Sequence, residues 1–138
     1  MTDFLHTKLA PGEIFETGAL ALAHVGDAVY ELMIRAYLCK QGTRSVKNLH
    51  KKTVAWVSAN AQARAAEKIM EFLTEEEKDV YLRGRNTKVN SVPKGAELAN
   101  YHAATGFESL FGWLYLKGEY DRINILFSHI TDENGFSE

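Results

Sequence analysis

A long apolar run, Gly18 to Leu38, constrains this sequence more than any other feature. It is too long for a strand and contains no proline, and its one internal glycine is Gly26, which predicts one long helix or two nearly collinear ones. Its apolar side chains point in almost every direction, so we expect the helix to be central and buried. The polar exceptions recur every three or four residues and therefore share one stripe: His24, Asp27, Glu31 and Arg35.

The stripe has two interpretations. In the first it is the only wet face of the helix, with Glu31 and Arg35 as an ordinary i,i+4 ion pair. In the second, Asp27 is held on a rigid element to bind a metal ion or to move protons. A second carboxylate on a comparable helix would favour the second interpretation.

A second long apolar helix is predicted from Ala96 to Lys117, and it carries Glu108 on a polar stripe of its own. Gly106 and Gly112 would permit close packing against another helix. Packing the two helices side by side would bring Asp27 and Glu108 together. Two carboxylates with open water positions suit Mg²⁺, an ion that prefers oxygen ligands and keeps much of its hydration. Such an ion can activate water against a phosphodiester.

The rest of the chain has helical patterns and no strand pattern, so the predicted fold class is all-α. Ser45, Ser58 and Thr74 are predicted N-caps, and the helix after Thr74 is expected to end near Leu82. A short helix is predicted for 120–129. We expect a single domain over 1–138, with an N-terminal arm at 1–17 and a polar tail at 131–138.

Charge and composition narrow the classes of function. Cys39 is the only cysteine, which argues against a disulfide framework. No leader or membrane span is apparent, so a cytoplasmic protein is expected. The net charge is −2, but residues 44–94 hold 11 Lys/Arg and 6 Asp/Glu, a balance of +5, while the rest holds 5 and 12, a balance of −7. This asymmetry points to a polyanionic partner.

The candidate RNA contacts are basic residues in the middle of the chain. One group is expected on a helix, and the other in a basic loop that is predicted to begin at Arg83; the alternative for the loop is a solvated connection. By position and charge the candidates are His50, Lys51 and Lys52 in the first group and Arg83, Arg85, Lys88 and Lys94 in the second.

Several of these segments resemble a known family. ALALAHVGDAVYELMIRAYL resembles the signature helix of the ribonuclease III family, and ATGFESLFGWLYL resembles the family's second motif. The resemblance assigns metal-binding, catalytic roles to Asp27 and Glu108. NLHKKT, VSANAQA and TEEEKDVYLRGRNTK are more specifically similar to Mini-ribonuclease III, the short branch with a catalytic domain and no double-stranded-RNA-binding domain. The similarity runs from about Gly18 to Phe127.

Two positions depart from the full-length enzymes. Their signature has a further Glu four residues before the Asp, where this chain has Ala23. Their second motif has an Asp three residues before the Glu, where this chain has Thr105. Half of the usual carboxylates are therefore missing, as in the Mini branch, and this leaves the number of bound metal ions open.

The resemblance implies a ribonuclease III catalytic-domain fold and a homodimer that binds double-stranded RNA across two active sites. It also implies Mg²⁺-dependent hydrolysis giving 5′-phosphate and 3′-hydroxyl ends, with large-subunit ribosomal RNA precursor as substrate and a ribosomal protein as a possible partner. A-form RNA is recognised mainly through phosphates and 2′-hydroxyls, which fits basic residues without evident base readers.

Three alternatives stay open from the sequence. The first is a non-catalytic double-stranded-RNA-binding or ribosome-assembly factor, which the residues at Ala23 and Thr105 support. The second is a metal-dependent phosphohydrolase of small nucleotides, and the third is a structural helical dimer. The sequence also leaves open whether Glu31 pairs with Arg35 or binds water at a metal, and we expect Tyr30 and His102 to pack.

Overall fold

A computed structural model describes residues 1–88 and 97–132 of the chain. The described residues form helices and no strand, which confirms the all-α prediction. Lys94 and the end of the predicted tail, residues 133–138, lie outside the described residues. In chain order the elements are α1 (Pro11–Glu16), α2 (Ala19–Lys40), α3 (Val46–Val57), α4 (Ala59–Ile69), the 3₁₀ helix η1 (Met70–Phe72), α5 (Glu75–Arg85), α6 (Leu98–Leu116) and α7 (Tyr120–Thr131).

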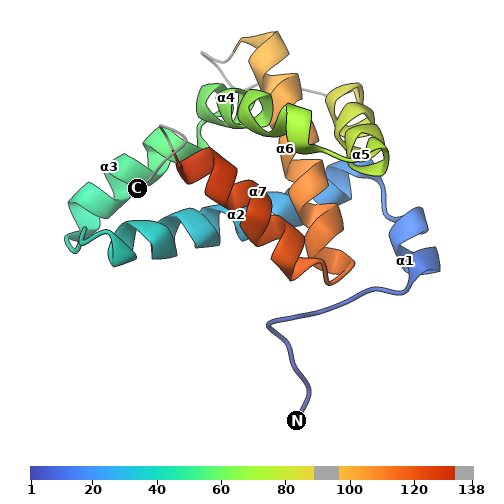
Figure 1. Ribbon diagram of the computed structural model, residues 1–138, viewed down its shortest axis with the longest axis horizontal. Helices are drawn as coiled ribbons and strands as arrows, with labels where there is room; N and C mark the ends of the chain where they lie inside the picture. Colours follow the sequence, from blue (N-terminus) through green and yellow to red (C-terminus); the bar gives the residue numbers. More distant parts are fainter. Residues whose placement is uncertain (89–96, 133–138) are drawn as a thin grey trace.

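Helix α6 is the centre of the fold. Helices α2, α4, α5 and α7 all pack against it, and Figure 1 shows it running through the middle of the bundle. Every residue from Ala104 to Leu114 is buried except Glu108, which is half-buried. The core therefore surrounds a helix that carries one carboxylate in the middle of an otherwise buried run.

The predicted caps explain where three of the helices begin. The Ser45 hydroxyl accepts a hydrogen bond from the Asn48 amide at 3.2 Å, and the Ser58 hydroxyl accepts one from the Ala61 amide at 3.2 Å. At the start of α5, the Glu77 amide donates to the Thr74 hydroxyl, while the Thr74 amide donates to the Glu77 carboxylate. These side chains satisfy backbone donors that have no partner inside the helix.

Helix α5 continues beyond the predicted end. We expected it to stop near Leu82 and a basic loop to begin at Arg83, but α5 runs to Arg85. Gly84 explains the difference, because a Cβ there would overlap the Ser109 side chain and lie 2.9 Å from the Gly106 Cα. The glycine that weakens a helix locally lets α5 pack closely on α6, and this packing keeps the last turn helical.

Helix α2 is buried on one face only, which corrects the expectation of a fully buried helix. Its buried residues form a stripe of Leu22, Ala23, Gly26, Tyr30, Ile34 and Leu38. On the opposite side Leu32 is 60% exposed. In the described part of the chain the N-terminal arm and α7 border this apolar face without covering Leu32. No helix among the described residues combines the length and apolarity needed to cross a membrane.

Candidate functional site

The site begins with a close backbone contact between α2 and α6. A Cβ added to Gly26 would overlap the carbonyl oxygen of Glu108 and lie 2.7 Å from the Gly112 amide nitrogen. A Cβ added to Gly112 would overlap the Leu22 carbonyl. Only glycine allows this approach. Because Asp27 follows Gly26 directly, the crossing holds its carboxyl group next to that of Glu108.

Asp27 and Glu108 interact directly, as the sequence predicted. Burial is the largest cause that raises the pKa of Glu108 to about 8, and the neighbouring Asp27 carboxylate raises it further. Asp27 itself is exposed. No ion pair to either carboxylate is found in residues 1–88 and 97–132. Within the described residues the pair therefore has no ion-pair partner, and without an added cation the raised pKa favours the protonated form of Glu108 near neutral pH.

Gln62 on α4 is the third polar group at this site. It is 1% exposed, and neither its amide nitrogen nor its carbonyl oxygen has a hydrogen-bond partner within normal limits. The amide is nevertheless close enough to Glu108 to lower the pKa of that carboxyl group, against the larger effects of burial and Asp27. Its side chain thus approaches Glu108 from a third helix without completing an ordinary hydrogen bond.

The remaining polar groups near the crossing have structural partners. Glu31 and Arg35 form the i,i+4 ion pair of the first interpretation. Thr105 is buried and its hydroxyl donates to the Tyr101 carbonyl at 3.0 Å. Ala23 is buried as well, so neither it nor Thr105 offers a carboxylate to the site.

Tyr30 and His102 were expected to pack, and Tyr30 does so completely. The Tyr30 ring is fully buried and meets Phe107 and Phe111 edge-on, with centroids 4.9 and 5.5 Å away. Its hydroxyl is buried and has no partner, and burial raises its pKa. His102 is half-buried, and its Nδ1 also has no partner. The structure gives no sign that either residue reaches the carboxylate pair.

The donor set fits a hard cation that keeps most of its water. Among the described residues, no group of three or more His, Cys, Asp or Glu side chains is arranged to hold a metal ion. The available donors are the two carboxylates, with the amide of Gln62 behind them. Such a set matches Mg²⁺, which is usually bound through one or two carboxylates plus water and substrate phosphates.

The predicted RNA contacts that the structure describes, which leave out Lys94, are exposed and separate into two groups. His50, Lys51 and Lys52 lie on α3, whereas Arg83 and Arg85 lie in the last turn of α5, with Lys88 just after it. Figure 1 shows α3 and α5 on opposite sides of the bundle, with α2 and α6 between them. The described basic candidates therefore form two separate groups, and their contact with RNA stays a prediction.

Sequence reasoning missed Gln62, although a signal was present. On α4 the buried positions are Ala61, Gln62, Ala65, Ala66 and Ile69, which follow the spacing of one helix face. Gln62 is the only polar residue on this apolar face. A lone amide at a core position of a helix requires a partner or a function.

Comparison with known proteins places the chain in a family. Residues 20–119 match the Ribonuclease III domain family. The chain is 49% identical over 129 residues to Mini-ribonuclease 3 of Thermoanaerobacter sp. (strain X514), covering 91% of each chain. It is 43% identical over 121 residues to Mini-ribonuclease 3 of Clostridium tetani, covering 87% of this chain and 80% of that one.

A solved structure has a similar fold. The crystal structure of protein FN1578 from Fusobacterium nucleatum is similar, with a TM-score of 0.80 and 30% sequence identity. The match covers 88% of this chain and 98% of that one. The resemblance seen in the signature helix thus extends to the whole fold. The chain belongs to the ribonuclease III family of endoribonucleases, and its curated relatives are of the Mini-ribonuclease III type.

Proposed function

We propose that this chain is a Mg²⁺-dependent endoribonuclease that hydrolyses double-stranded RNA, with Asp27 and Glu108 as catalytic metal ligands. One observation carries the proposal: two carboxylates converge at the α2–α6 crossing, and no protein cation among the described residues balances them. The raised pKa of Glu108 indicates that its ionised form needs an added positive charge. Family membership supplies the reaction class, hydrolysis of a phosphodiester.

The chain's own residues have distinct roles in this proposal. Gly26 and Gly112 fix the distance between the helices that carry the two carboxylates. Asp27, being exposed, faces the solvent from which RNA arrives, while Glu108 is anchored in the buried part of α6. A bound Mg²⁺ would activate water for attack at phosphorus and neutralise charge that develops in the transition state. The products would be 5′-phosphate and 3′-hydroxyl ends.

Two basic groups flank the carboxylates and are proposed to bind the duplex backbone. His50, Lys51 and Lys52 are exposed on α3, and Arg83, Arg85 and Lys88 are exposed at the end of α5. Lys94 belongs to this proposal by its charge alone. Their separation suits a long ligand that lies across the bundle, because an RNA duplex presents phosphates along its whole length.

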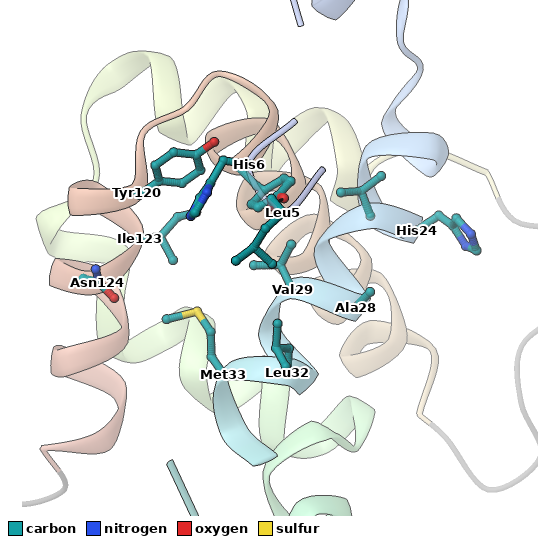
Figure 2. A pocket seen from close by; sticks show the side chains of 12 residues that line it. Leu5, His6, His24, Ala28, Val29, Leu32, Met33, Tyr120, Ile123 and Asn124 are labelled. Atoms are coloured by element: carbon teal, nitrogen blue, oxygen red, sulfur yellow. Dashed lines mark hydrogen bonds between the residues drawn. The ribbon is translucent and has the colours of Figure 1, made fainter. Parts of the chain in front are cut away.

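The uncovered face of α2 supports a homodimer. It lines a groove of about 590 Å³ whose walls are mostly apolar. Figure 2 shows Val29 and Met33 of α2 on the side toward Ile123 of α7, with Leu5 of the N-terminal arm between Val29 and Ile123, and Leu32 also lines the groove. A second copy placed here would remove this apolar area from water. Sedimentation of Leu32→Asp should then give a lighter species than the native chain.

The natural substrate is proposed from the resemblance to the Mini branch. Large-subunit ribosomal RNA precursor in the cytoplasm is the expected RNA, with a ribosomal protein presenting the duplex. Addition of the ribosomal protein to purified precursor RNA, followed by primer extension across the cut sites, tests both parts. Cleavage at random positions with and without the protein would argue against this substrate.

The first experiment is cleavage of end-labelled duplex RNA with Mg²⁺, comparing the native chain with Asp27→Asn and with an EDTA control. We expect metal-dependent cuts with 5′-phosphate ends that disappear in the variant. Raising the salt concentration should weaken RNA binding steeply, because phosphate contacts release counterions. Binding of several structured RNAs without any cleavage would contradict the proposal and indicate a non-catalytic RNA-binding protein.

A further inference from the structure

Among the described residues, Gln62 and Tyr30 are the two fully buried side chains whose polar atoms have no hydrogen-bond partner, and Gln62 is the one that acts on Glu108. Glu77, Thr105 and Ser109 are also buried, but Arg122 donates to the Glu77 carboxylate, Thr105 donates to the Tyr101 carbonyl, and the Ser109 hydroxyl donates to the Ala19 carbonyl. Both polar atoms of Gln62 lack a partner. A buried donor or acceptor without a hydrogen bond costs about 1–3 kcal/mol, so an amide left in this state points to a missing ligand.

The position of Gln62 indicates which ligand is missing. Helix α4 packs against α6, and Asn100 of α6 donates to Asn60 of α4 at 2.8 Å, just before Gln62 in the chain. Ala65, Ala66 and Ile69 bury the same face of α4 further along. The amide of Gln62 is thus fixed on a buried face of a helix that packs against α6, and it lies close enough to the Glu108 carboxyl group to act on it.

The two polar groups of the Gln62 amide can form two different hydrogen bonds at the site. Its NH₂ group is a donor, and an ionised Glu108 is an acceptor with two oxygens. Its carbonyl oxygen is an acceptor, and the water molecules that hydrate Mg²⁺ are donors. Ala23 and Thr105 place no carboxylate here that would accept those hydrogen bonds.

We propose that Gln62 is a positioning residue for the metal site: its NH₂ group holds the Glu108 carboxylate, and its carbonyl oxygen accepts a hydrogen bond from the ion's hydration shell. This inference rests on the proposed function, since it requires the carboxylate pair to bind a cation. Groups of this kind orient metal ligands, and their loss weakens metal binding about 10- to 100-fold.

The test measures Mn²⁺ binding to the RNA-free protein, by electron paramagnetic resonance of the free ion. Gln62→Met keeps the length of the side chain and removes the amide. We expect its Kd for Mn²⁺ to rise at least about tenfold, while the thermal unfolding midpoint of the metal-free protein stays the same or increases. Gln62→Leu should behave in the same way and replaces the first variant if that one does not fold.

Two controls separate this inference from the proposed function. Asn60→Ala removes the neighbouring contact between α4 and α6, and it should leave the Kd for Mn²⁺ close to that of the native chain. Asp27→Asn should abolish binding. If Asp27→Asn abolishes binding but both Gln62 variants bind Mn²⁺ as tightly as the native chain, the role of Gln62 is refuted and the proposed function stands. If the native chain binds no Mn²⁺, both fail together.

Discussion

Glu77 and Glu108 are both glutamates in the interior of the bundle, but their surroundings are opposite. Arg122 donates to both carboxylate oxygens of Glu77, each at 2.8 Å, and the Thr74 amide donates to it as well. Burial alone would raise the pKa of Glu77, yet the hydrogen bonds and charge of Arg122 bring it below its usual value. Glu108 meets Asp27 instead, and its pKa is raised to about 8.

The difference separates a structural carboxylate from one available to a ligand. Glu77 has its cation within the fold and closes the junction between α5 and α7. Glu108 has a second carboxylate beside it and no ion pair to a Lys, Arg or His within residues 1–88 and 97–132, so a bound cation would stabilise its ionised form. A buried carboxylate whose partner raises its pKa is a candidate for a functional group, and one paired with arginine is a candidate for a stabilising contact.

The largest expected effect is on activity. Glu108→Gln should lower the rate of duplex RNA cleavage by at least about a thousandfold, because it removes a proposed metal ligand whose effect on the transition state is several kcal/mol. Single-turnover cleavage with saturating Mg²⁺ measures it. Glu77→Gln is the matched control and should keep most of the activity at a temperature where it is folded. Equal losses in both variants would show that Glu108 has no special role.

A methyl group added at the close contact between α2 and α6, which brings Asp27 next to Glu108, should destabilise the fold. Gly26→Ala places a Cβ on the Glu108 carbonyl, so we expect it to lower the free energy of unfolding by about 3 kcal/mol or more. Gly12→Ala is the control, since nothing lies within 4 Å of a Cβ there and α1 is helical at that point. Urea denaturation compares the two. A neutral Gly26→Ala would mean that α2 and α6 are further apart than described.

Removing Arg122, the cation that pairs with Glu77, should lower the free energy of unfolding by less than Gly26→Ala does. Arg122→Met leaves the carboxylate buried without its partner, and it should lower the free energy of unfolding by about 2 kcal/mol, below the range for fully buried pairs because Arg122 is partly exposed. Lys78→Met breaks an exposed i,i+3 ion pair with Glu75 and should change the free energy of unfolding by less than about 1 kcal/mol. If the two variants lost similar amounts of unfolding free energy, the buried Glu77–Arg122 pair would contribute no more to stability than the surface pair.

The two glutamates should also respond oppositely to pH in the metal-free protein. Folding raises the pKa of Glu108 from 4.5 to about 8, so the folded state holds this proton more tightly. The free energy of unfolding should therefore fall as pH rises from about 5 to about 8, and Glu108→Gln should flatten this slope. Folding lowers the pKa of Glu77, so its contribution is present above pH 4.5 and is lost as pH falls below it.

Denaturation in EDTA across this range measures both slopes. Mg²⁺ at pH 8 should restore stability to the native chain but not to Glu108→Gln, since binding of the ion favours the ionised pair. A native chain whose stability does not change between pH 5 and pH 8 in EDTA would contradict the raised pKa.

Features that depend on residues close together in the chain could be predicted from the sequence. The hydroxyls of Ser45, Ser58 and Thr74 cap the next helix within three residues, so their effect depends on neighbours in the chain alone. The apolar runs around Gly26 and Gly112 predicted two long helices, and the carboxylates within them predicted the convergence of Asp27 and Glu108. The catalytic roles of both residues stay predictions.

Contacts between distant segments decided the rest. Gly84 remains helical because α5 packs against Ser109, and α2 leaves Leu32 exposed because no described element covers it. Lys52 and Arg83 both belong to the basic middle of the sequence, yet the bundle places α3 and α5 on opposite sides. The packing of α4 on α6 is what places Gln62 near Glu108, and the sequence alone did not indicate it. Hydrogen bonds within a helix are fixed by residues a few positions apart, whereas burial and pKa depend on which helices meet, and that is decided by the packing of the whole core.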